Sequence, residues 1–90
     1  MNTNSGIGAE LRELRTMLGW TMEYTIERAG GVVDVARLSR VERGVTGWSM
    51  KPNQIDAIRR VLEIGMVARA REFRQMVAGL ENDQREAVSA

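Results

Sequence analysis

Apolar residues recur at every third or fourth position near the start of the chain, which is the period of an amphipathic α-helix. We expect Ser5 to cap this first helix and Gly19 to end it, because glycine adopts the left-handed conformation found after helix C-termini. The residues expected to form its inward face are Ile7, Leu11, Leu14, Met17 and Leu18.

A second, shorter helix is predicted from Thr21, a favourable N-cap, to about Ala29. Met22 and Ile26 are expected to point inward from it. The segment 30–33 begins with two glycines and ends with two valines, so we interpret it as a turn that carries a core anchor rather than as a strand.

A third helix is predicted from Val35 to Arg43, with Asp34 as its N-cap and Gly44 after its end. Leu38 and Val41 fall on its inward face. The residues from Val45 to Lys51 have no helical period and are expected to form a loop.

Pro52 suits the first turn of a fourth helix, which is expected to bury Ile55, Ile58, Val61 and Leu62. Gly65 either ends that helix or lies inside a longer one. The helical apolar series then continues, and beyond Asn82 we expect a frayed end. The apolar series after Gly65 consists of Met66, Ala70, Phe73, Val77 and Leu80.

Composition removes several function classes. The 90 residues, 43% hydrophobic and 28% charged, suit one small globular domain. Without cysteine or histidine, the chain cannot use disulfides, thiol catalysis, ordinary zinc sites or imidazole chemistry, so we expect no enzyme activity, no metal and no cofactor. No membrane span is visible, and the polar segment 1–8 does not resemble a signal peptide, so we expect a cytoplasmic protein.

The net charge of +1 is unevenly distributed along the chain. Between Asp34 and Arg60 there are six basic residues and three acidic ones, whereas segment 10–28 has an excess of one negative charge. Twelve of the thirteen cationic residues are arginine, the side chain best suited to bidentate contacts with phosphate and guanine. The local basic excess indicates a nucleic-acid surface around the third helix.

Two short helices joined by a glycine turn form the arrangement of a helix-turn-helix. The segment Leu38–Gly44 (Leu-Ser-Arg-Val-Glu-Arg-Gly) resembles the Ile-Ser-Arg-Ile-Glu-Arg-Gly segment of the Cro/CI repressor family, also called the XRE family. Further similar runs are 7–15, 18–21 and the glycine at 30, so the resemblance covers about two-thirds of the chain.

The resemblance implies a role for each matching position. Asp34 would open the recognition helix, whose outward face would enter the major groove. Arg43 would contact phosphate at the end of that helix, and Thr21 would lie near another phosphate. Thr46 and Lys51 belong to the loop that the family lays along the DNA backbone. The outward positions of the recognition helix are Val35, Ala36, Arg37, Ser39 and Arg40.

Other positions are expected to be structural. Arg15 and Glu42 match the positions where the family forms an ion pair between the first and third helices. An ordinary solvated helix face remains the alternative for Arg37 and Arg40. The residues interpreted as packing rather than base-stacking residues are Trp20, Trp48, Met50 and Phe73.

Two features depart from the family pattern. Met22 stands where the family usually has a glutamine that reaches a phosphate. The turn through Gly31 and Val32 is about two residues longer than usual, which changes how the third helix is presented.

These observations predict an all-α, five-helix, lambda-repressor-like helix-turn-helix DNA-binding domain over 1–65, with an appended C-terminal helix over 66–90. The expected function is sequence-specific binding of double-stranded DNA by a dimeric phage or bacterial repressor. The alternative is an interaction module or antitoxin-like regulator that binds a protein partner through the same fold. The stripe from Met66 to Leu80 is expected first to pack on the domain core and second to form a homodimer surface.

Overall fold

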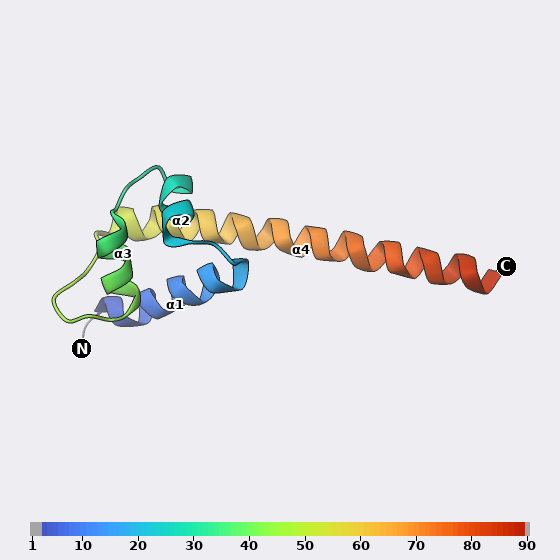
Figure 1. Cartoon of the computed structure of the whole chain (residues 1–90), viewed down its shortest axis with the longest axis horizontal. Helices are drawn as coiled ribbons and strands as arrows, with labels where there is room; N and C mark the ends of the chain where they lie inside the picture. Colours follow the sequence, from blue (N-terminus) through green and yellow to red (C-terminus); the bar gives the residue numbers. More distant parts are fainter. Residues whose placement is uncertain (1–2, 90) are drawn as a thin grey trace.

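The computed structural model describes the backbone of residues 3–89 and the side chains of residues 6–84. The described part is all helical and contains no strand, as the sequence predicts (Figure 1). The prediction of five helices is wrong, because the expected fourth and fifth helices are one continuous element. The helices are α1 (Thr3–Leu18), α2 (Met22–Arg28), α3 (Val35–Glu42) and α4 (Pro52–Ser89).

The two short helices begin at their predicted caps. The Tyr24 amide donates to Thr21 Oγ1 over 3.0 Å, and the Arg37 amide donates to Asp34 Oδ1 over 2.7 Å. Each bond satisfies a backbone N–H that has no partner within its helix. Pro52 is the first residue of α4, as predicted.

The first helix differs from its prediction in two places. It begins at Thr3, before the expected cap Ser5, whose side chain lies outside the described residues. Met17, expected to point inward, is 56% exposed. The end of the helix agrees with the sequence, because Gly19 has a φ of 71° and its amide donates to the Thr16 carbonyl.

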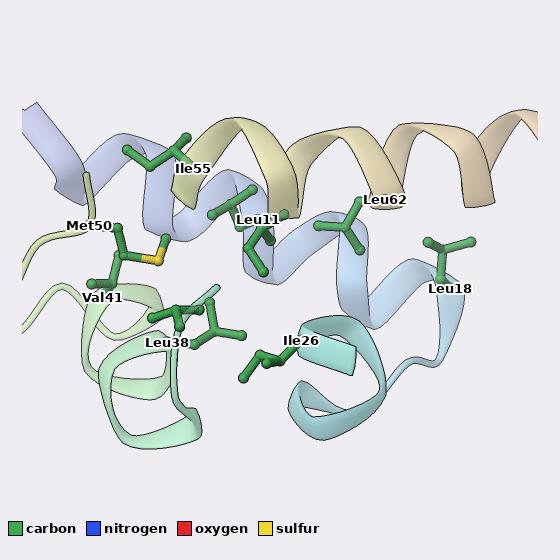
Figure 2. Packing of buried hydrophobic residues seen from close by; sticks show 10 residues of the cluster. Leu11, Leu18, Ile26, Leu38, Val41, Met50, Ile55 and Leu62 are labelled. Atoms are coloured by element: carbon green, nitrogen blue, oxygen red, sulfur yellow. The ribbon is translucent and has the colours of Figure 1, made fainter. Parts of the chain in front are cut away.

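The core lies where the four helices meet (Figure 2). In Figure 2, Leu11 from α1, Leu38 from α3 and Leu62 from α4 point into one cluster, and all three are fully buried. Val33, from the turn before α3, is also buried, as its interpretation as a core anchor requires. The remaining buried hydrophobic residues are Leu18, Ile26, Val41, Met50, Ile55 and Ile58.

Gly65 lies inside α4 and does not end it, so no break separates 52–65 from the segment that follows. An added Cβ at Gly65 would lie 2.8 Å from Trp20 Cζ2 and 3.0 Å from Leu18 Cδ1. The glycine therefore allows the turn after α1 to pack directly on α4. Beyond Asn82, where the sequence predicts a frayed end, the helix continues to Ser89.

The molecule is elongated because α4 extends well beyond the other helices (Figure 1). Its extents are 64 × 26 × 18 Å and its radius of gyration is 18.0 Å, whereas a compact domain of this length has about 12 Å. Met66 packs against the core, but Phe73 and Leu80 are 65% and 63% exposed. The expectation that the whole stripe packs on the core is therefore wrong, as is the interpretation of Phe73 as a packing residue.

Candidate nucleic-acid interface

The α3 helix buries one side and leaves the other open. Leu38, Val41 and Glu42 are buried, while Val35 and Ala36 are exposed. Ser39 is half-buried, and Arg43 is exposed with its Nε donating to the Ser39 carbonyl over 3.3 Å. The buried side holds α3 against the domain, so the predicted contact residues lie on its free side or flank it.

Arg37 and Arg40 are half-buried because both lie against Trp48. The guanidinium carbon of Arg40 is 4.4 Å from the Trp48 ring centroid, and that of Arg37 is 5.2 Å away. Arg37 Nη1 also donates to the Ser49 carbonyl over 2.8 Å. Such cation–π contacts orient a guanidinium while leaving its remaining N–H groups free to donate.

Trp48 makes contacts that the sequence interpretation did not predict. It packs against the core, as expected, but it also supports both arginines of α3. It lies in a loop eleven residues after Arg37, where no periodic pattern connects the two. The only signal was an aromatic residue inside a glycine-containing loop close to a basic helix.

The loop between α3 and α4 brings Trp48 back toward α3. Gly44 and Gly47 have φ angles of 69° and 86°, which glycine adopts without strain. Met50 is 4% exposed and fastens the end of the loop to the core. Thr46 is exposed in this loop, where the family resemblance implies a contact with the DNA backbone.

Lys51 is exposed at the start of α4, and its amide donates to Gln54 Oε1 over 2.8 Å. Between Lys51 and α3 there is an open hollow of about 500 Å³. The hollow is lined by Arg37, Ser49, Met50, Lys51 and Gln54. Two cationic side chains thus border one open space next to α3.

The ion pair expected between α1 and α3 is present. Arg15 Nε and Nη2 donate to the two carboxylate oxygens of Glu42 over 2.9 and 2.7 Å, and Arg15 Nη1 donates to the Trp20 carbonyl. The hydrogen bond with Glu42 raises the pKa of the Arg15 guanidinium above its ordinary value. The Glu42 side chain is only 1% exposed, so its negative charge is neutralised inside the domain.

The turn between α2 and α3 spans residues 29–34 and is held at both ends. Gly30 and Gly31 have φ angles of 86° and 69°, and the Gly31 amide donates to the Ile26 carbonyl over 2.9 Å. Near α3, Gln54 Nε2 donates to the Val32 carbonyl over 2.9 Å. The turn is therefore tied to α2 and α4 before α3 begins.

The predicted site residues divide into three groups. Those between Val35 and Lys51 lie on α3 and on the loop that folds back to it. Thr21 lies at the start of α2, where its hydroxyl is already used as a cap. The apolar stripe of α4, in contrast, extends away from α3 (Figure 1).

None of the described helices combines the length and apolar content needed to cross a membrane. Among the described residues, no three acidic side chains lie close enough together to hold a metal ion. Comparisons of this chain with protein-family models, with curated proteins and with solved structures give no match.

Proposed function

We propose that this protein is a transcriptional regulator that binds double-stranded DNA, as a dimeric repressor with α3 in the major groove. The observation that carries the proposal is the charge at α3. Arg37, Arg40 and Arg43 lie on or beside its free side, while its one carboxylate, Glu42, is buried in the ion pair with Arg15. The major groove of B-DNA admits an α-helix, and arginine is its commonest specific reader.

Each side chain has a role in this proposal. Arg40, supported on Trp48, donates two hydrogen bonds to guanine, and Val35 and Ala36 contact thymine methyl groups. Arg43 and Lys51 neutralise phosphates on either side of the groove. Because Trp48 restricts the guanidinium of Arg40 before binding, less conformational entropy is lost when the complex forms.

The first test is salt dependence. Binding of the purified protein to duplexes selected from a random pool is measured by fluorescence anisotropy between 50 and 200 mM salt. If about four phosphates are neutralised, affinity falls on the order of a hundredfold across this range. Absence of binding to any duplex at 50 mM salt would overturn the proposal.

The second test uses variants on the selected duplex. Arg40→Ala is expected to reduce discrimination against a mismatched base by about 5- to 150-fold, which corresponds to ~1–3 kcal/mol. Trp48→Ala is expected to weaken binding in the same direction, because Arg40 loses its support. Arg71→Ala, an exposed arginine on α4 away from α3, is the matched control and should retain sequence preference. Equal effects of Arg40→Ala and Arg71→Ala would contradict the assignment of α3.

A second candidate function is a regulator that binds another protein. The exposed apolar side chains on the extended part of α4 favour it, because such a stripe is a docking surface for a helical partner. The two candidate functions differ in which substitutions impair binding. A protein-binding module would tolerate Arg40→Ala and show no salt-dependent association with duplex DNA.

A further inference from the structure

One face of α4 is covered by the domain in its first part and exposed to solvent farther along the helix. Two series of residues seven apart lie on this face, Leu62–Arg69–Met76 and Met66–Phe73–Leu80. Leu62 is fully buried and Met66 packs against the core, whereas Phe73, Met76 and Leu80 are 65%, 66% and 63% exposed. Alternating spacings of three and four residues are those of a coiled-coil seam.

Arg69 marks the point where the domain stops covering this face. Its Nη2 donates over 3.0 Å to the carbonyl of Leu18, the last residue of α1. Beyond this bond, α4 continues without a neighbouring helix (Figure 1). We call the apolar residues of this face beyond Arg69 the distal stripe; they are the exposed Phe73, Met76 and Leu80 and the half-buried Val77.

We propose that a second copy of this chain covers the distal stripe, so that two α4 helices pair along it. A helix that extends into water draws most of its stability from packing of its apolar face, and here that face has no partner within the chain. A two-fold interface requires the same patch on both subunits, and a seam of this spacing can pack against a copy of itself. The inference extends the dimer of the proposed function by naming its surface, but the observations behind it and its test involve no DNA.

Charge favours a second copy over a strongly charged partner. The segment from Met66 to Gln84 carries three basic and three acidic residues, so two copies meet without net repulsion. The basic residues are Arg69, Arg71 and Arg74, and the acidic ones are Glu72, Glu81 and Asp83. An acidic or basic partner would gain nothing from a surface whose charges balance.

The available area suits a dimer of moderate affinity. Two-thirds of a phenylalanine surface is about 130 Å², and three side chains exposed to that extent, Phe73, Met76 and Leu80, present on the order of 400 Å² per copy. Pairing two copies therefore buries about 800 Å² before flanking residues are counted, which is below the limit of about 1,200 Å² for stable complexes and within the range of transient ones. A dissociation constant of about 1–100 µM is expected from an interface of this size.

The test is sedimentation equilibrium of the full chain without DNA, at concentrations from about 1 to 500 µM, which span the expected dissociation constant. The mass is expected to rise from 10.1 kDa toward twice that value. Phe73→Asp and, separately, Leu80→Asp are expected to weaken the dimer by about 30-fold or more, as at other interface centres. Circular dichroism verifies that both variants keep their helices.

The matched control is Ile64→Asp. Ile64 lies on α4 nine residues before Phe73, which is two and a half turns, so it points to the opposite side of the helix. It is 57% exposed, close to the exposure of Phe73, and its substitution should leave the dimer unchanged. Three results would overturn the proposal: a monomer at every concentration, unchanged dimers in both stripe variants, or unfolding of both, which would place the stripe in the core.

Discussion

At the scale of single residues, the close packing of α1 on α3 depends on a glycine, which has no side chain to separate them. Gly8 on α1 lies so near α3 that an added Cβ would collide with the Val41 carbonyl oxygen and lie 2.8 Å from its carbon. Backbone atoms cannot swing away as a long side chain can. Gly8 therefore sets the spacing of α1 and α3, and with it the distance over which Arg15 reaches Glu42.

Gly8→Ala is expected to lower the free energy of unfolding by about 3 kcal/mol, because α1 must move away from α3. Gly6→Ala is the control in the same helix, since no atom lies within 4 Å of its added Cβ. This second change should stabilise the protein by about 0.5–1 kcal/mol through helix propensity alone. Urea unfolding followed by circular dichroism measures both, and equal effects would contradict the close approach.

At the scale of elements, α4 contains two glycines whose surroundings differ. Gly65 lies against Trp20 and Leu18, while no atom lies within 4 Å of an added Cβ at Gly79. Glycine inside a helix costs about 1 kcal/mol relative to alanine. At Gly65 that cost is offset by the packing of the turn after α1, whereas at Gly79 no packing within the described chain offsets it.

Gly65→Ala should therefore destabilise the domain by about 1–2 kcal/mol, because Trp20 must shift away from α4. Gly79→Ala should raise helix stability by about 1 kcal/mol. Thermal unfolding monitored at 222 nm separates the two, and tryptophan fluorescence reports displacement of Trp20. Stabilisation by Gly65→Ala would show that Trp20 does not press on α4.

At the scale of the whole molecule, the elongated shape arises because α4 is much longer than the helices that pack against it. The first three helices and the start of α4 form the core, and the rest of α4 accounts for the length of 64 Å. The α3 helix and the distal stripe therefore occupy separate parts of the molecule. The surface proposed for DNA and the surface proposed for pairing therefore do not compete for the same part of the molecule.

The shape itself can be measured in solution. A monomeric Phe73→Asp variant should give a radius of gyration near 18.0 Å by small-angle X-ray scattering. If α4 instead bent at Gly65 and folded onto the domain, the value would approach about 12 Å, as in a compact domain. The salt concentration should be held constant, so that a compact result contradicts the extended helix rather than reflecting altered screening.

Much of the fold was predictable because its signals are local. Thr21 and Asp34 cap the helices that follow them, since a cap needs only a side-chain oxygen beside free backbone amides. Leu38 and Val41 are buried as the helical period requires. Met17 is exposed despite its place in the same kind of pattern, because a period identifies a helix face but not how far the neighbouring helices extend across it.

The position of α3 and its positive charge were predictable, but the contacts that hold its arginines were not. The Leu38–Gly44 segment and the basic excess indicate α3, and both follow from the order of the amino acids. The contact of Arg37 and Arg40 with Trp48 depends on how the intervening loop folds back, so it has no local signal.

The sequence by itself determined where the helices α2, α3 and α4 begin, which residues of α3 face the core and where positive charge collects. These properties depend on backbone hydrogen bonding and periodicity within a few residues. Only the tertiary structure decided that Gly65 continues α4, that Trp48 supports two arginines and that Phe73 meets solvent. Each of these outcomes depends on which segments, distant in sequence, come into contact, and the apolar period of α4 is the same whether or not another helix covers it.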